Sequence, residues 1–399
     1  MEKRNIHLQT TPVDEALDKY ADALSPFLRR AGEEIKTIDA LGRVTAEAVL
    51  ARYNSPLYDA AAMDGIAVIG ARTQGAPMRL SAGEDFVTVD TGDPIRAPFD
   101  AVVMAEDIEQ LADGSVRIRA PATAGKHVRP MGEDIEQGEC ILPPKHRIRP
   151  VDLGALLSGG ITTISVWRRP AVAIFPTGSE LIEPGCEPKE GDIIESNSRM
   201  LEALVTQSGG HATRHAPIPD DYDSIRRAVE QAAESFDMVL INAGSSAGRE
   251  DYTVHILREL GEVVIHGVAM KPGKPVILAI VSGKPVIGLP GYPVAAYLAY
   301  QCFAAPVLAR LAGLPPPKPK TVRAIMKSPL KSSPALREYV RVTLKREGEK
   351  LMASPLKRGA GSVLSLVRAD GFCVLDQGLE GADAGQEVEI ALDSLPRFL

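Results

Sequence analysis

The sequence lacks paired cysteines. Its four cysteines are Cys140, Cys186, Cys302 and Cys373, and no two of them are close enough in the chain to form a Cys-x-x-Cys redox pair or a zinc knuckle. Isolated cysteines of this kind are most often small buried hydrophobic residues in a reducing compartment. A cytoplasmic protein is therefore expected.

The chain also has little of what nucleic-acid binding requires. It contains 45 basic and 52 acidic side chains, a net charge of −7, and only 5% aromatic residues. A broad basic surface and a platform for base stacking are therefore not expected, and no nucleic-acid partner is predicted. A local anion site remains compatible with this balance.

No secretory signal or membrane span is expected. The N-terminal residues Met1 to His7 contain no apolar segment. The longest uncharged stretch lies between Lys284 and Arg310, and prolines and glycines interrupt it. That composition predicts a strand, a turn and a buried helix rather than a helix that crosses a membrane.

Several catalytic motifs are absent as well. The sequence contains no Gly-x-Ser-x-Gly elbow, no P-loop and no Gly-x-Gly-x-x-Gly motif that opens a helix. Among seven histidines only His211 and His215 have a ligand-like spacing. They lie in a predicted strand, where residues four apart are about 13 Å distant. A zinc site is not predicted.

What is present indicates several domains, because 399 residues exceed a single core. Apolar spacing predicts a helix over residues 11–24. Short alternating strands with Gly, Pro and Asp turns predict a β-rich region from 53 to 144. From 171 to 311 apolar strands alternate with helices, which is typical of a parallel sheet covered on both faces. A proline-rich linker, 313–320, precedes a predicted β-barrel over 321–399.

Polar loops follow three of the predicted parallel strands, at 176–181, 242–251 and 290–293. Ligands bind at this edge of such sheets, although any tight strand-to-helix turn also favours glycine and a capping residue. Glu180, Asp220 and Asp251 lie at or near these strand ends. If they converge, a divalent cation is needed to neutralise them, and Mg²⁺ prefers such oxygen ligands. Each acid could instead be a solvated loop residue.

The sharpest short motif is Met270-Lys271-Pro272-Gly273-Lys274-Pro275. Its Pro-Gly centre predicts a tight turn, and Lys271 and Lys274 would suit a phosphate or another oxyanion. An exposed basic turn without function is an equally good interpretation of the motif alone. Asp64, Thr91 and Arg341 carry little information by themselves, since turns and solvated strand faces explain them as well.

Taken in order, the motifs resemble the MoeA-type molybdenum insertases, the molybdopterin molybdenumtransferases that include the C-terminal domain of gephyrin. The resemblance covers essentially the whole chain. The matching stretches are Ala61–Gly65, Thr91–Pro94, Asp100–Met104, Gly132–Asp134, Pro176–Leu181, Asp220–Asp221, Gly248–Tyr252, Met270–Pro275, Gly288–Pro293, Arg337–Arg341 and Gly361–Ser362.

The resemblance implies a multidomain α/β plus β fold in an elongated homodimer. It divides the chain into a segmented linking domain (1–45 and 147–169), an inserted β-rich domain (46–146), a three-layer α/β domain with a parallel-rich sheet (170–315) and a C-terminal β-barrel (320–399). The implied reaction takes adenylylated molybdopterin and molybdate and, with Mg²⁺, yields molybdenum cofactor and AMP. The implied further partners are the molybdopterin adenylyltransferase and molybdoenzyme apoproteins.

The resemblance also assigns roles. Glu180, Asp220 and Asp251 would hold Mg²⁺ or position water as catalytic acids. Asp64, as a further catalytic acid, and Thr91, as a substrate-binding residue, would reach the cleft from the partner subunit. The residues expected to contact anionic substrate groups are Lys271, Lys274, Arg341 and Ser362. Cations of this kind suit the charge that develops when a phosphoanhydride breaks, and molybdate is itself a dianion.

The chain departs from the family at the anion end of the cleft. Tyr292 replaces a usual asparagine, Gly267 a frequent basic residue, and residues 243–248 read Ala-Gly-Ser-Ser-Ala-Gly instead of Gly-Gly-Val-Ser-Val-Gly. Two alternatives therefore remain. One is a paralogue that prefers tungstate, and the other is a pterin carrier or scaffold without catalysis.

Overall fold

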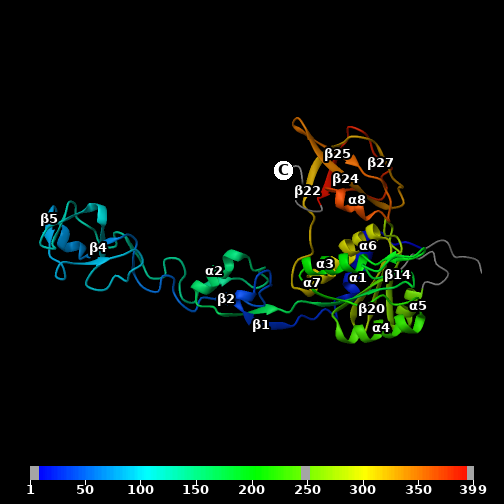
Figure 1. The fold of residues 1–399 in the computed structure, drawn as a ribbon, viewed down its shortest axis with the longest axis horizontal. Helices are drawn as coiled ribbons and strands as arrows, with labels where there is room; N and C mark the ends of the chain where they lie inside the picture. The colour runs from blue at the N-terminus through cyan, green and yellow to red at the C-terminus, as the bar shows by residue number, and fades with distance from the viewer. Residues whose placement is uncertain (1–8, 244–251, 393–399) are drawn as a thin grey trace, which may run out of the picture. The chain divides into compact units, whose positions relative to one another are not determined.

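The computed structural model describes residues 9–243 and 252–392 (Figure 1). It divides into two compact units, of which one comprises Met1–Ala31 with Arg168–Leu399 and the other Gly32–Trp167. The described residues that precede Gly32 thus group with the second half of the chain. The four-domain division expected from the resemblance remains a prediction.

The unit Gly32–Trp167 begins and ends on one antiparallel ribbon. In it β1 (Gly32–Lys36) pairs with β12 (Thr163–Trp167), and β2 (Val49–Leu50) pairs with β11 (Cys140–Leu142). Helix α2 (Pro150–Ser158) starts at a proline, which suits a helix start because proline lacks the N–H that would be unpaired there. Buried Ile148, Leu156 and Val166 join these elements in one core cluster.

Between these elements lies the β-rich region that the alternating pattern predicts. Its strands form two three-stranded antiparallel sheets and one short pair. The first sheet contains β4 (Gly65–Val68), β6 (Phe86–Val89) and β7 (Ala101–Met104); the second contains β5 (Met78–Leu80), β8 (Ile108–Gln110) and β9 (Val116–Ile118); the pair is β3 (Ala60–Ala61) with β10 (Val128–Arg129).

The other unit is built on a six-stranded sheet in the order β16-β13-β17-β21-β20-β18. Its strands are β13 (Ala171–Pro176), β16 (His211–Arg214), β17 (Met238–Ala243), β18 (Gly261–His266), β20 (Ile277–Val281) and β21 (Lys284–Pro290). The first four strands in this order run parallel, and every residue of β20 is buried. Nearly continuous burial explains why the inner strands β13, β17 and β21 are apolar at most positions rather than at alternate ones, whereas the edge strand β16 has no buried residue.

The sheet is parallel-rich, as the resemblance implies, but it is not parallel throughout. Strands β20 and β21 form an antiparallel hairpin, and β18 pairs antiparallel with β20. Only Ser282 and Gly283 join the hairpin strands, and both have positive φ angles of 50° and 74°. A two-residue turn of this kind matches the twist of a hairpin and is too short for a parallel crossover.

Helices cover both faces of the sheet (Figure 1). The helices on one face are α4 (Tyr222–Ser235) and α5 (Tyr252–Leu260), and those on the other are α1 (Val13–Leu24), α3 (Asn197–Gln207), α6 (Pro293–Ala299) and α7 (Ala305–Leu311). Helix α1 contributes fully buried Tyr20, whose hydroxyl donates to the carbonyl of Ala279 at 2.9 Å. The three-layer α/β arrangement is therefore present.

Residues Pro293–Leu311 form a nearly continuous helix with a π-helical turn at Tyr300–Ala304. By length and composition this helix could cross a membrane, but 78% of its apolar window is buried inside the protein, as in the core helix of a globular domain. The predicted strand, turn and buried helix of this stretch are therefore confirmed.

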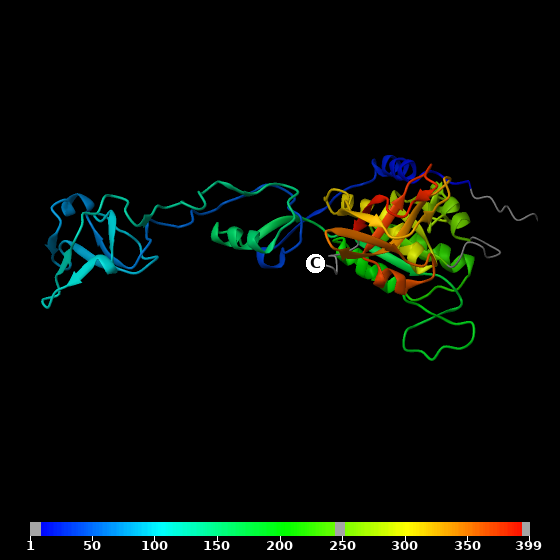
Figure 2. The ribbon, with the colours of Figure 1, turned by 90° about the horizontal axis from the view of Figure 1, so that it is seen from above.

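After the linker, five strands close into a barrel in the order β24-β25-β22-β28-β26, with β26 paired back to β24 (Figure 2). The barrel strands are β22 (Thr321–Met326), β24 (Arg337–Glu347), β25 (Lys350–Pro355), β26 (Gly371–Leu375) and β28 (Glu387–Leu392). A sixth strand, β19 (Met270–Lys271), comes from the α/β region and pairs parallel with β24. The barrel and the α/β region are thus joined by backbone hydrogen bonds.

Candidate active site

Asp64 and Thr91, which lie in different segments of the β-rich region, are in direct contact. One carboxylate oxygen of Asp64 accepts hydrogen bonds from the hydroxyl and from the backbone N–H of Thr91, both at 2.6 Å. These two bonds hold the pKa of the Asp64 carboxyl below its ordinary value, because they stabilise the charged form. The pair is exposed, so both groups are open to a ligand.

The backbone around the pair explains its placement. Asp64 directly precedes β4, and its carbonyl accepts from the N–H of Ala105. A side chain at Gly65 would collide with β7, since an added Cβ would lie 2.0 Å from the carbonyl oxygen of Val103. Glycine at this position therefore lets β4 approach β7 and fixes the start of the strand beside Asp64.

We expect Thr91→Val to raise the pKa of Asp64 toward the ordinary aspartate value, because valine removes the hydroxyl bond and leaves the backbone bond. An NMR titration of the Asp64 carboxyl would measure this change, with the exposed strand variant Thr88→Val as control. The contribution of the bond to stability is present above the unfolded pKa and is lost as pH falls through the lowered folded pKa. Equal Asp64 titration curves in the wild type and Thr91→Val would contradict the assignment.

Glu180 lies in the turn that follows β13, at the carboxyl edge of the parallel sheet. Thr177 in this turn is buried, and its N–H donates to the carbonyl of Asn242 at the end of β17. The Glu180 carboxylate folds back over Gly178, where an added Cβ would lie 2.7 Å from its nearer oxygen. A glycine is therefore required at 178 for the carboxylate to take this position.

Asp220 lies beside the same turn, since its N–H donates to the hydroxyl of Ser179 at 3.1 Å. The segments that carry Glu180 and Asp220 are therefore adjacent, as expected from the strand-end argument. The third predicted acid, Asp251, lies outside the described residues.

Within 9–243 and 252–392 no group of three or more His, Cys, Asp or Glu side chains could hold a metal ion. The donors that are described fit Mg²⁺ in type, because carboxylate and hydroxyl oxygens are hard ligands.

The Gly-Leu-Pro-Gly segment (288–291), whose first three residues end β21, lies at the same edge of the sheet. Buried Asn242 donates to the carbonyl of Pro290 at 2.8 Å, and Asn197 of α3 donates to that of Gly291 at 2.6 Å. The N–H of Val294 donates to the carbonyl of Ala360, in the segment between β25 and α8 (Val363–Arg368), at 3.0 Å. The Gly-Leu-Pro-Gly segment thus connects the ends of the parallel strands with the segment that contains Ser362.

Lys271 ends β19 and lies beside Glu338 of β24 in the parallel pairing. Its ammonium is 3.3 Å from a carboxylate oxygen of Glu338, and the lysine side chain is 51% exposed. The predicted tight turn follows, because Gly273 has a φ of 119°. Lys274 in this turn is exposed. Both lysines are open to an anion, but Lys271 already has an acidic partner.

Arg341 is buried, with 3% exposure, which was not evident from its position on an alternating strand. Its guanidinium donates to the carbonyls of Lys357 at 2.9 Å and Gly359 at 3.1 Å, and burial lowers the pKa of this group. Ser362 is exposed at the start of α8 (Val363–Arg368). Arg341 therefore holds the segment that leads to Ser362, and its contact with a substrate remains a prediction.

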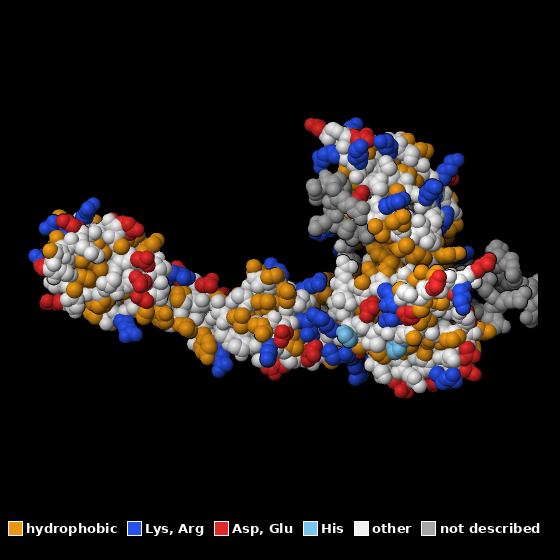
Figure 3. Space-filling model, viewed as in Figure 1, with side chains coloured by type: hydrophobic (Ala, Val, Ile, Leu, Met, Phe, Trp, Pro, Cys, Tyr) orange, Lys and Arg blue, Asp and Glu red, His pale blue; other side chains and the backbone are white. Residues whose placement is uncertain are grey.

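Two residues of this region escaped the sequence analysis as individual sites. Glu338 is a buried carboxylate with 3% exposure, and Arg358 donates to it at 3.0 Å. The barrel carries many Lys and Arg side chains on the face that Figure 3 shows. The sequence did contain a signal for Glu338. This charged residue lies on the same face of its strand as the apolar residues Val340 and Val342.

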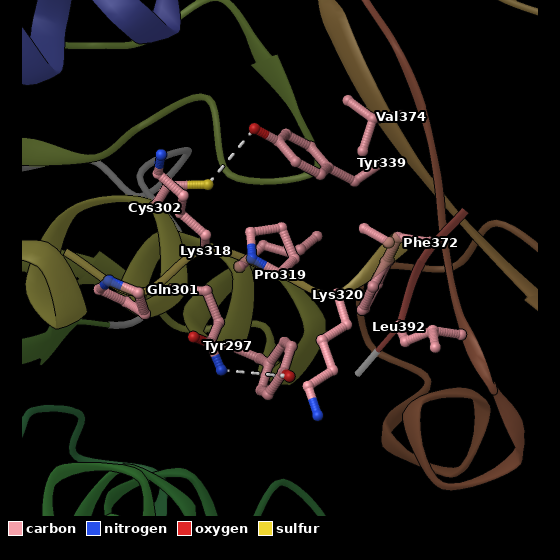
Figure 4. Close-up of a pocket in the computed structure, with 13 residues that line it drawn as sticks. Tyr297, Gln301, Cys302, Lys318, Pro319, Lys320, Tyr339, Phe372, Val374 and Leu392 are labelled. Carbon is pink, nitrogen blue, oxygen red and sulfur yellow. Dashed lines mark hydrogen bonds between the residues drawn. The ribbon is translucent and has the colours of Figure 1, made fainter. Parts of the chain in front are cut away.

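A cavity of about 570 Å³ lies elsewhere in this unit (Figure 4). Its lining combines the α6–α7 helix, the linker and the barrel and includes Cys302, Lys320 and Phe372. The Cys302 thiol contacts the Tyr339 hydroxyl at 3.4 Å, and burial raises the pKa of the thiol to about 11. None of the predicted site residues lines this cavity, so it is separate from the groups described above.

Three family models match the chain in order. The MoeA N-terminal region, domains I and II, matches residues 11–160; a probable molybdopterin binding domain matches 173–310; and the MoeA C-terminal region, domain IV, matches 323–392. The Met-Lys-Pro-Gly-Lys-Pro turn and the loops at the sheet edge lie in the second match, whereas Glu338 and Arg341 lie in the third.

Named relatives are similar over nearly the full length. A putative molybdopterin biosynthesis protein of Methanocaldococcus jannaschii is 31% identical, covering 95% of this chain and 96% of the relative. A molybdopterin molybdenumtransferase of Staphylococcus aureus is 29% identical, covering 98% and 97%. A crystal structure of a molybdopterin biosynthesis MoeA protein from Pyrococcus horikoshii has a TM-score of 0.82 at 32% identity and covers 96% of this chain and 99% of that one.

Proposed function

Since this chain belongs to the MoeA family, we propose that it inserts molybdate into adenylylated molybdopterin with the help of Mg²⁺, releasing molybdenum cofactor and AMP. The family membership makes it a transferase of molybdenum cofactor biosynthesis. The expected fold class, with a three-layer α/β part, an inserted β part and a C-terminal barrel, is confirmed. The substrate form and the metal are the proposal.

One observation carries the proposal: acids and cations lie on segments that are linked by hydrogen bonds within one unit. Glu180 and Asp220 lie at the sheet edge, and the Gly-Leu-Pro-Gly segment connects this edge to the segment held by Arg341. Transfer of a group from a nucleotide-bearing substrate needs oxygen ligands for a cation and positive charge for the phosphates and the molybdate. This arrangement supplies both.

The roles follow from these positions. We assign Glu180, Asp220 and Asp251 to holding Mg²⁺, which when bound neutralises phosphate charge. Lys271 and Lys274 would bind anionic groups of the substrates, Arg341 would keep the 357–361 segment in place, and the exposed hydroxyl of Ser362 would donate to an oxyanion.

Other parts of the proposal rest on the family resemblance alone. They are the homodimer in which Asp64 and Thr91 act from the partner subunit, the molybdopterin adenylyltransferase and molybdoenzyme apoproteins as partners, and the cytoplasmic location. The contact between Asp64 and Thr91 supports a joint role, because the hydroxyl keeps the carboxylate charged and oriented.

The proposal is tested by following AMP release from adenylylated molybdopterin with molybdate and Mg²⁺. We expect Glu180→Gln to need about tenfold more Mg²⁺ for half-maximal rate, because an amide is a weaker ligand than a carboxylate. Glu187→Gln is the matched control, because Glu187 is an exposed acid in the same connection between β13 and α3. Absence of AMP release by the wild type would reject the proposed reaction. An unchanged Mg²⁺ requirement in Glu180→Gln would reject the assignment of Glu180 as a metal ligand.

The same assay separates the two alternatives. Tyr292 is 57% exposed and lies against Gly361, the neighbour of Ser362. A paralogue that prefers tungstate would release AMP faster with tungstate than with equal molybdate. A pterin carrier would bind the pterin without release of AMP.

A further inference from the structure

Glu338 is a buried carboxylate with an uneven set of partners. One of its oxygens accepts from Arg358 at 3.0 Å and lies 3.3 Å from the ammonium of Lys271. Its other oxygen is buried and has no hydrogen-bond partner in the described part of the chain. Arginine–carboxylate pairs are frequently bidentate, as Arg337 with Asp14 is here. Here, instead, two cations lie next to a single carboxylate oxygen of Glu338.

Arg358 is only partly used by these contacts. One terminal nitrogen serves both Glu338 and the carbonyl of Lys331, and the guanidinium is 33% exposed. Among residues 9–243 and 252–392, its other two nitrogens have no partner at hydrogen-bond distance. A guanidinium that is held through one terminal nitrogen can donate to a tetrahedral oxyanion through its other nitrogens, because these donors are already oriented.

The charge around Glu338 points to the same ligand class. The segments that carry Glu338 and its partners (270–275, 331, 337–341 and 357–358) contain seven basic residues and one acid, and one of the seven, Arg337, pairs with two acids outside them, Asp14 and Asp376. The other six basic residues are Lys271, Lys274, Lys331, Arg341, Lys357 and Arg358. Such an excess of positive charge attracts anions to this surface. A buried ion pair alone stabilises a fold only weakly, so stability does not account for the cluster.

We infer that Arg358 is an additional oxyanion-binding residue, which contacts molybdate or a substrate phosphate together with Lys271, and that Glu338 positions both cations. The inference rests on the proposed function and extends it to Arg358, which lies outside the matching stretches, and to Glu338, which lies within one of them but was given no role. Glu338 acts through its two partners and does not itself meet the anion, because carboxylate and oxyanion repel each other.

The test measures molybdate binding by calorimetry and the KM for molybdate in AMP release. For Arg358→Gln we expect Kd and KM to rise about tenfold with kcat changed less than twofold, because one charged hydrogen bond is lost. Arg323→Gln removes another exposed arginine of the barrel that pairs with a glutamate, and it should bind as the wild type does. If Arg358→Gln is unfolded by circular dichroism, Arg358→Lys replaces it, with a rise of about threefold expected.

Glu338→Gln separates positioning from simple electrostatics. Loss of its charge alone would tighten molybdate binding, whereas loss of positioning weakens it, and we expect a severalfold higher Kd. Molybdate binding that tightens in Glu338→Gln, or that is unchanged in a folded Arg358 variant while the wild type binds and reacts, overturns this inference alone. Failure of the wild type to bind molybdate and release AMP overturns the proposed function and the inference with it.

Discussion

Lys271→Ala is expected to lower kcat/KM for AMP release by about 100-fold or more. The ammonium of Lys271 is half exposed and lies 3.3 Å from Glu338, so the substitution removes a cation from the anion site and leaves the buried carboxylate with Arg358 alone. Loss of a single preorganised donor to a developing oxyanion commonly costs two to three orders of magnitude in rate. Steady-state kinetics with varied molybdate would measure the loss.

The matched control is Lys327→Ala. Lys327 also pairs with a glutamate of β24, Glu347, at 2.9 Å and has a similar exposed fraction of 55%. It lies in the barrel but belongs to none of the segments around Glu338. Nearly wild-type activity is expected, because exposed ion pairs of this kind contribute little to stability. A loss that is equal in both variants would mean that the barrel as a whole, rather than the anion site, had been damaged.

Gly65→Ala is expected to lower the free energy of unfolding of the β-rich region by about 3 kcal/mol or more. The new Cβ would lie 2.0 Å from the Val103 carbonyl oxygen and 3.0 Å from the Ala105 nitrogen, both backbone atoms of the neighbouring segment. Because backbone cannot move aside as a flexible side chain can, the pairing of β4 with β7 must open. Asp64, next to this glycine, would lose its fixed distance to Thr91.

Hydrogen exchange of peptides over residues 60–110 would measure this loss directly. Gly83→Ala is the control, since Gly83 also has a positive φ, 77°, but an added Cβ would have no neighbour within 4 Å. Its expected cost is about 1 kcal/mol, from backbone strain alone. Equal exchange in the two variants would show that the close approach of β4 and β7 does not limit the stability of the region.

Local sequence patterns predicted most of the elements that position the site. The helix expected over 11–24 is observed at Val13–Leu24, and the β-rich region expected from 53 to 144 contains β4, β6 and β7, because turn residues and apolar spacing mark these elements. The β20–β21 hairpin was missed as a hairpin although Ser282-Gly283 signals it. The apolar runs on both sides resembled buried parallel strands, and burial on both faces produces the same composition in either direction.

The candidate site was less accessible from the sequence. Residue types and strand-end positions placed Glu180 and Asp220 at one edge, and the family motifs selected Lys271 and Arg341. Neither source indicated that Arg341 is buried or that Glu338 and Arg358 belong to the same cluster. A strand pattern identifies two faces, but it does not say which neighbour covers each face.

The sequence by itself determined where helices and strands begin and end, the tight turn at Pro272-Gly273, the absence of zinc and nucleotide-loop motifs, and the family. These properties depend on neighbouring residues, whose steric and hydrogen-bonding preferences act over a few positions. Only the tertiary structure decided that Lys271 meets Glu338, that Asp64 meets Thr91, and that Arg341 holds the loop before Ser362. Such contacts depend on strand pairing and loop closure between distant segments, and no local pattern encodes the register in which those segments meet.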